Sequence, residues 1–169
     1  MIKYILRYTI WFIFLVLFQL LILNNIQFSG YINPYLYVFL ILILPFETPF
    51  LVLFTIAFLL GFAIDIGNNT LGINASATVF IATLRPFVIN IFAPRAGYNT
   101  ETYPRASYYG INWFLKYAAL LTFLHHLFLF FVESFSFDNF FHTLLKVILS
   151  FAFSLVLIMI TELFFYKKR

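Results

Sequence analysis

Two adjacent histidines, His125 and His126, are the residues whose chemistry first suggests a metal site. They lie in an apolar run, where a polar ring without a hydrogen-bond partner costs free energy. Neighbouring residues of a helix point about 100° apart, so these two rings cannot chelate one ion as a pair spaced by four residues could. His142, near the end of another predicted helix, is a poor third ligand. We therefore expect no metal, and an interhelical hydrogen bond from one of the two histidines.

A second candidate site lies between Gly61 and Ala75. Gly61 and Asp65 are four residues apart and share one helical face, where glycine permits close helix approach and a carboxylate accepts hydrogen bonds. Gly72, Ala75 and Ser76 give the following helix a face of small residues. Three roles remain open for Asp65: capping the turn, holding two helix ends together or presenting a partner surface, and binding a ligand or ion.

Charged residues inside apolar runs need partners, because a lone charge is costly in a membrane. Arg85, Glu47 and Glu162 all fall toward the same predicted side. A pair between Arg85 and one of the two glutamates would reduce the desolvation cost of the guanidinium. The sequence predicts a structural clamp there.

Lys146 lies about two turns into the last predicted helix. Its long side chain reaches the interface by snorkelling. Glu133 and Asp138, in the preceding turn, are its predicted partners.

Motifs for catalysis are missing from the sequence. It contains no Gly-x-Ser-x-Gly turn, no glycine-rich phosphate loop and no HExxH helix. It has no cysteine, which excludes thiol nucleophiles and cysteine-ligated metals. Its longest basic stretch is residues 167–169, too short for a nucleic-acid footprint. We expect neither an enzyme, nor a cofactor, nor nucleic-acid binding.

About six apolar blocks must position these residues. A membrane-spanning helix needs about 20 mostly apolar residues to cross a hydrocarbon core of about 30 Å. The chain has 169 residues, of which 64% are hydrophobic and 9% charged, more apolar surface than a soluble domain of this size can bury. The sequence predicts one all-α domain over residues 1–169, a polytopic membrane bundle. Its predicted helices are residues 4–23, 34–44, 50–66, 71–92, 113–132 and 140–166, with a cytoplasmic loop at 94–112.

Prolines and glycines mark the boundaries. Pro45 and Pro49 enclose a tight turn, and residues 67–70 form the next one. Asn69 or Thr70 is suited to capping the following helix. The fourth helix has two possible ends, because Arg85 and Pro86 interrupt an apolar run: either the helix kinks there, or a short spanning piece is followed by an interfacial one.

Basic residues set the predicted orientation, since lysine and arginine near the ends of spans stay on the cytoplasmic side. With the N-terminus inside, Lys146 alone of the ten basic residues lies toward the outer half. Six spans with both termini cytoplasmic is the self-consistent arrangement. Asp65, Glu133 and Asp138 then lie at the outer surface.

The layout resembles the bacterial rod-shape-determining protein MreD family. The residues that carry this resemblance are Gly61-x-x-x-Asp65 and then Leu71-Gly72-x-x-Ala75, after a proline-bounded second hairpin. The resemblance implies a non-enzymatic inner-membrane subunit of the cell-wall elongation machinery. It also implies binding of the bitopic protein MreC and, through it, of the MreB filament and the peptidoglycan synthases.

The family's fold looks like the substrate-binding subunit of energy-coupling-factor vitamin transporters, which supplies an alternative function. Such subunits use small residues on the first helix to dock the coupling protein, yet residues 11–23 contain no Gly, Ala or Ser. Their outer loops carry polar ligand contacts, and residues 24–33 are short. The scaffold interpretation is therefore preferred over a transporter subunit. An anchor of some other membrane complex is the third possibility.

Overall fold

The computed structural model describes residues 2–26, 32–70, 72–95, 97–99, 102–135 and 139–166, with the side chains of residues 2–5 left out. This part of the chain is helical. The elements are α1 (Ile2–Leu21), the 3₁₀ turn η1 (Leu23–Asn25), α2 (Phe39–Ile43), α3 (Phe50–Asn68), α4 (Ile73–Ile91), α5 (Ala106–Tyr109), α6 (Ile111–Ser134) and α7 (Phe140–Phe164).

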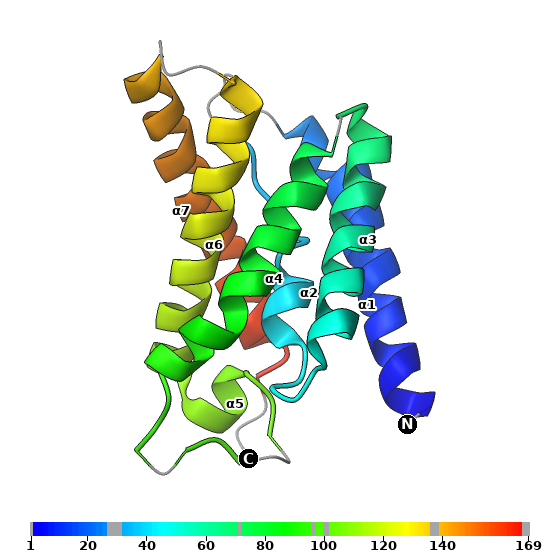
Figure 1. Ribbon diagram of the computed structural model, residues 1–169, viewed down its shortest axis with the longest axis vertical. Coiled ribbons are helices and arrows are strands. Elements are labelled where there is room, and N and C mark those ends of the chain that lie inside the picture. The colour runs from blue at the N-terminus through cyan, green and yellow to red at the C-terminus, as the bar shows by residue number, and fades with distance from the viewer. Residues whose placement is uncertain are drawn as a thin grey trace.

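The five long helices stand side by side as an upright bundle (Figure 1). In that view α1, α3 and α6 run upward, whereas α4 and α7 run downward. Consecutive helices pack as antiparallel neighbours: α3 against α4, α4 against α6, and α6 against α7, with α1 beside α3. The start of α1 and the end of α7 therefore lie at the same end of the bundle, together with α5 (Figure 1).

Four helices in the described part of the chain are long and apolar enough to cross a membrane. They are Leu6–Asn25, which covers most of α1 and η1, Phe50–Asn68, Ile111–Ser134 and Phe140–Phe164. This is the pattern of a multi-pass membrane protein. The predicted count of six spans is thus corrected. α4 has 19 residues, as many as α3, but Asn74, Arg85 and Asn90 make it more polar than the other long helices.

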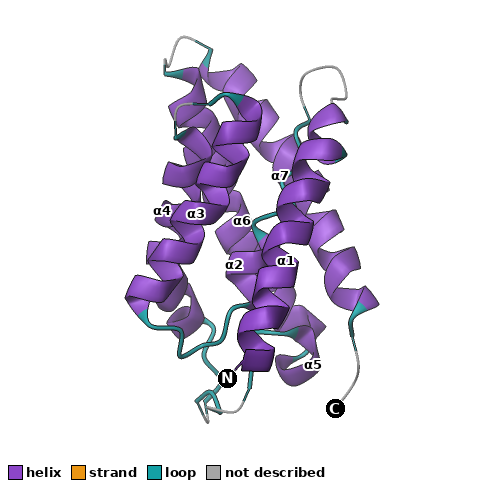
Figure 2. Ribbon diagram, turned by 90° about the vertical axis from the view of Figure 1, so that its right-hand side faces the viewer, coloured by secondary structure: helices purple, strands orange, loops and turns teal. Residues whose placement is uncertain are grey.

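The second predicted span, residues 34–44, is the clearest correction. It forms only the five-residue helix α2. The backbone N–H groups of Tyr35 and Leu36, which precede α2, bond to side chains of α7 and α1. Leu44 precedes Pro45 and is extended, with a ψ of 148°, as the proline ring requires. Figures 1 and 2 both place α2 inside the bundle, enclosed by the long helices.

This segment is the centre of the core rather than a lipid-facing span. Every residue from Leu36 to Leu44 is buried. Large apolar side chains on the outer faces of the long helices are exposed instead, as at Leu51 with 76% exposure. Irregular backbone is tolerated at membrane depth only where protein covers it, and here the surrounding helices do so.

The remaining boundaries follow local chemistry. α3 ends at Asn68 and is capped by Asn69, which adopts a left-handed conformation with a φ of 54°. Gly67 and Asn68, predicted as part of a turn, therefore belong to the last turn of the helix. α4 continues through Pro86 to Ile91, and so neither breaks nor divides at Arg85. The predicted loop 94–112 contains the short helix α5, and α6 begins directly after Gly110.

Candidate functional site

The corner between α3 and α4 brings the predicted Asp65 site together. Asp65 is 3% exposed, and its carboxylate accepts hydrogen bonds from four donors. The backbone N–H and the side-chain amide of Asn74 each donate to Oδ1 at 3.0 Å, and the N–H of Ala75 donates to Oδ2 at 2.8 Å. The hydroxyl of Thr70 donates to Oδ1 as well. The last turn of α3 therefore caps the first turn of α4, whose N–H groups would otherwise be unsatisfied.

Gly61 is a point of close approach between the same two helices. A Cβ at this position would stand 2.5 Å from both the Cα of Ala75 and the carbonyl oxygen of Asn74. Glycine is required here because the opposing atoms are backbone and cannot rotate away. Gly72 serves a different purpose: its φ of 83° lies in the left-handed region and turns the chain into α4. The fifth residue of the motif, Leu71, lies outside the described residues.

Polar contacts continue from this corner into the core. The hydroxyl of Tyr37 donates to Oδ1 of Asn74 at 2.9 Å and lies 3.1 Å from Nε2 of His125. Since the hydroxyl proton is used on Asn74, Nε2 of His125 must carry a proton and donate to Tyr37. In the described part of the chain Nδ1 of His125 has no partner.

His126 carries its proton on the other ring nitrogen, Nδ1. Its Nδ1 lies 2.7 Å from the carbonyl oxygen of Thr122, so Nδ1 is the donor. Its Nε2 then accepts from the hydroxyl of Ser154, 2.9 Å away on α7. We expected an interhelical bond from one of the two histidines; both have a partner outside α6, Tyr37 for His125 and Ser154 for His126. Among the described residues, no three His, Asp or Glu side chains gather closely enough to hold a metal ion.

Side chains of the long helices satisfy the backbone of the buried segment at its upper end. Gln19 of α1 bonds to it twice, donating from Nε2 to the carbonyl of Pro34 at 2.8 Å and accepting at Oε1 from the N–H of Leu36 at 3.0 Å. Ser154 of α7 accepts from the N–H of Tyr35 at 2.8 Å. These bonds satisfy buried backbone groups that have no partner within α2.

Arg85 satisfies backbone groups at the lower end of the buried segment and does not form the predicted ion pair. Its guanidinium donates to the carbonyl of Leu44, to that of Pro45 at 3.3 Å, and to the hydroxyl of Tyr117 at 3.0 Å. The side chain is 1% exposed. The predicted pair of Arg85 with Glu47 or Glu162 is thus corrected. The guanidinium bonds instead to buried carbonyl groups that have no helical partner, because α2 ends before Pro45.

Glu162 is instead paired with Arg105, a residue of the predicted loop. Nε of Arg105 lies 2.6 Å from Oε2 of Glu162, and both side chains are buried. The N–H of Ala106 donates to Oε1 of the same carboxylate at 2.8 Å. The ion pair fastens α5 to the lower end of α7. Glu47 is exposed.

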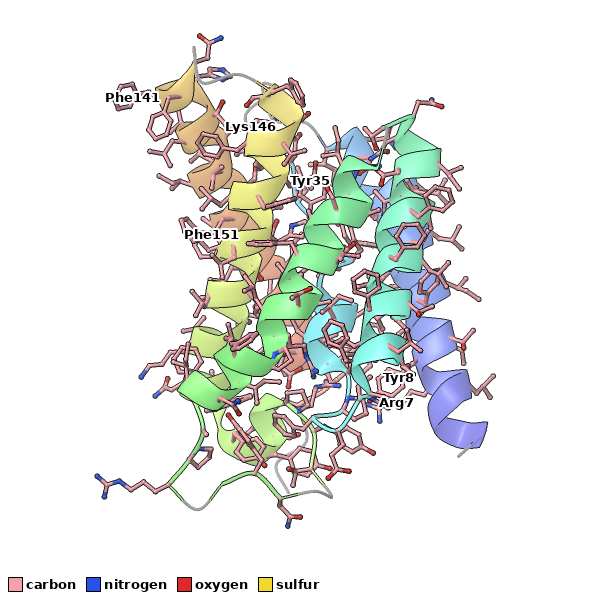
Figure 3. The ribbon with its side chains drawn as sticks, viewed as in Figure 1. Arg7, Tyr8, Tyr35, Phe141, Lys146 and Phe151 are labelled. Atoms are coloured by element: carbon pink, nitrogen blue, oxygen red, sulfur yellow. The ribbon has the colours of Figure 1, made fainter. Side chains whose placement is uncertain are left out.

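Lys146 lies near the upper end of the bundle, as Figure 3 shows. Its ammonium group is 3.0 Å from Oε2 of Glu133 and 4.5 Å from the centre of the Phe130 ring. Glu133 is one of the two partners predicted for it. The other, Asp138, lies outside the described residues.

A polar cavity of about 290 Å³ opens at this upper end. Its wall combines residues that follow α1, the start of the buried segment, the α3–α4 corner and the end of α6. The polar members of the wall include Asn24, Asn33, Tyr35, Asn68, Asn74 and Glu133.

A second hollow, of about 860 Å³, lies between α1 and α3 near the lower end. Apolar side chains such as Phe12, Val52 and Ile56 make most of its wall. Of the two hollows, the upper one has more polar side chains in its wall.

Sequence reasoning missed five residues that fix the buried segment: Gln19, Tyr37, Asn74, Tyr117 and Ser154. It also missed Arg105, the partner of Glu162. One signal was visible, because Ser150 and Ser154 are four residues apart in an apolar run and so share a helical face. That face meets the backbone N–H groups of Asn33 and Tyr35.

Comparison with protein families, with curated proteins and with solved structures finds no match to this chain. The sequence and the geometry therefore establish only a class of protein. The chain is a multi-pass helical membrane protein whose core contains hydrogen-bonded polar groups. The expected likeness to the transporter subunit finds no support in a solved structure.

Proposed function

We propose that this chain is a non-enzymatic inner-membrane subunit of the bacterial cell-wall elongation complex. In this role it binds an MreC-like bitopic partner, and through it an MreB-like filament and the peptidoglycan synthases. Both termini lie in the cytoplasm. The proposal takes its direction from the resemblance of the Gly61–Ala75 segment to the MreD family.

The observation that supports a scaffold is the saturation of the α3–α4 corner. Four donors within the chain occupy the Asp65 carboxylate, and Gly61 is closed by the backbone of α4. Such a corner holds two helices in one arrangement and leaves Asp65 little capacity for a substrate. A rigid corner of this kind suits stable partner binding more than turnover.

Co-purification tests the proposal. An affinity-tagged chain, expressed at its native level and extracted in mild detergent, is expected to enrich an MreC-like protein in mass spectrometry. Depletion of the chain is expected to make rod-shaped cells round. Absence of the partner from the purified material, together with normal rods after depletion, would contradict the proposal.

A matched pair of variants separates partner binding from membrane insertion. Gly61→Leu drives a side chain into the backbone of α4, whereas Leu51→Ala changes an exposed residue on the same helix. Both proteins are expected in the membrane fraction. Only Gly61→Leu is expected to lose the partner, and equal retention by both variants would show that the corner does not support the interface.

The alternative of a small-molecule transporter subunit has one observation in its favour, the polar cavity at the upper end of the bundle. It predicts uptake of a solute that depends on this chain and on a coupling protein. Uptake assays in cells with and without the chain distinguish this function from the scaffold.

A further inference from the structure

The polar cavity is built differently from the rest of the interior. The hollow between α1 and α3 has a mainly apolar wall, but this hollow of about 290 Å³ is lined by four asparagines, a tyrosine and a glutamate among others. Ligand sites begin at about 300 Å³, so the space suits a molecule of roughly a dozen heavy atoms.

Some of the polar wall is already satisfied within the protein. Nδ2 of Asn24 donates to Oδ1 of Asn68 at 2.6 Å, and its Oδ1 accepts from Gln19 at 2.9 Å. Asn74 is bonded to Asp65, Thr70 and Tyr37. These bonds hold the asparagine side chains in fixed positions, which is the preorganisation that a binding site needs.

Other groups on the wall keep hydrogen-bonding capacity. In the described part of the chain, no bond is made by the side-chain amide of Asn33, by the hydroxyl of Tyr35 or by Nδ2 of Asn68. Glu133 uses only Oε2 to bond Lys146, which leaves Oε1 available. The cavity thus offers amide and hydroxyl groups that can donate or accept hydrogen bonds, beside one carboxylate.

The charge on the wall favours a cation. Glu133 belongs to the lining, and among the described residues that line the cavity there is no lysine or arginine. Asp65 lies directly behind Asn74 and Thr70 and accepts only from uncharged donors, so its charge is not cancelled locally. Lys146 forms an ion pair with Glu133 and balances part of its charge. The Glu133 side chain is still 43% exposed and so remains accessible to a ligand.

We propose that this cavity binds a small amine that also carries hydroxyl groups. The ammonium group lies against Oε1 of Glu133, and the hydroxyl groups bond to Asn33, Asn68 and Tyr35. The Tyr35 ring adds an aromatic surface for the body of the ligand. This site goes beyond the scaffold role and does not depend on it, since partner binding is measured separately.

Titration calorimetry on the purified full-length chain in lipid nanodiscs tests the site. The probes are D-glucosamine, D-glucose and D-glucuronate, which share one ring size and differ in charge at neutral pH. Saturable binding is expected for glucosamine, with glucose about tenfold weaker, the loss typical of one charge-assisted hydrogen bond. Glucuronate is expected to give no saturable heat.

Two matched substitutions locate the binding. Glu133→Gln is expected to reduce glucosamine affinity to that of glucose, while Glu47→Gln, an exposed glutamate outside this cavity, leaves it unchanged. Tyr35→Phe removes only the hydroxyl and is expected to weaken both sugars. Unchanged melting temperatures show that each variant is folded.

Failure of glucosamine to bind the unchanged protein, or equal binding of all three sugars, overturns the proposal. So does a glucosamine affinity that is unchanged in the double variant Glu133→Gln, Tyr35→Phe. If the amine binds but the MreC-like partner is absent, the site stands and only the scaffold fails. If the partner is retained without amine binding, the reverse holds.

Discussion

The carboxylate of Asp65 accepts a hydrogen bond from the backbone N–H of Ala75 at 2.8 Å, so the end of α3 supplies the cap for the start of α4. α4 has no side-chain cap of its own at Gly72. A negative charge at this point also favours the positive end of the α4 dipole. This geometry gives Asp65 two of the roles open to it, because the carboxylate caps the turn and also holds the two helix ends together.

Substitution of Asp65 should reduce the stability of the protein, less for Asp65→Asn than for Asp65→Leu. In Asp65→Asn, one of the two oxygens becomes an amino group that faces an N–H donor, at a cost of about 1–3 kcal/mol. Asp65→Leu removes every acceptor from Asn74 and Ala75 and should cost more. Thermal unfolding in detergent measures both. Glu47→Gln, on an exposed glutamate, is the control and should stay within about 0.5 kcal/mol; equal stability of all three variants would remove Asp65 from the corner.

Gly61→Ala should destabilise the protein more than Gly67→Ala, although both replace a glycine of the same helix. A Cβ at Gly61 meets the backbone of Ala75, whereas at Gly67 it meets only the flexible side chain of Leu20. Overpacking against a fixed backbone costs about 1–3 kcal/mol. Unfolding curves of the two variants make the comparison. The reverse order of stability would mean that α3 and α4 are not in close contact at Gly61.

Gln19→Leu should destabilise the bundle although leucine suits an apolar helix. The change leaves the carbonyl of Pro34 and the N–H of Leu36 without partners in a buried place, at about 1–3 kcal/mol for each group. Asn25→Leu, at an exposed amide on the same end of the chain, is the control. Hydrogen exchange at Leu36 should rise only in the first variant, and protection that persists there would show another partner for its N–H.

Both termini should face the cytoplasm, and the connections at residues 94–112 and 133–139 should face opposite sides. Reporter fusions after residue 169, within residues 94–112 and within residues 133–139 should read inside, inside and outside. The reason is the bias of basic residues, which the antiparallel packing of α3, α4, α6 and α7 accommodates. An outside reading from the 94–112 loop would reverse the orientation.

Much of the architecture follows from apolar runs and their breakers. Long apolar blocks predict α1, α3, α6 and α7, because a lipid-facing helix must be apolar over its full length. The spacing of Gly61 and Asp65 also predicts that the two share a face, since four residues make about one turn. These features are local and need no knowledge of neighbours.

The polar core was decided by tertiary structure. Residues 34–44 read as an apolar helix, yet partners distant in sequence, among them Gln19, Arg85 and Ser154, bond to the backbone around it. In the same way Arg105, rather than Arg85, reaches Glu162. Sequence by itself determined which segments belong in a membrane, because transfer free energy depends on composition. Which buried groups form hydrogen bonds with one another depends on how the five long helices pack. The tertiary structure alone therefore determines the hydrogen-bond partners.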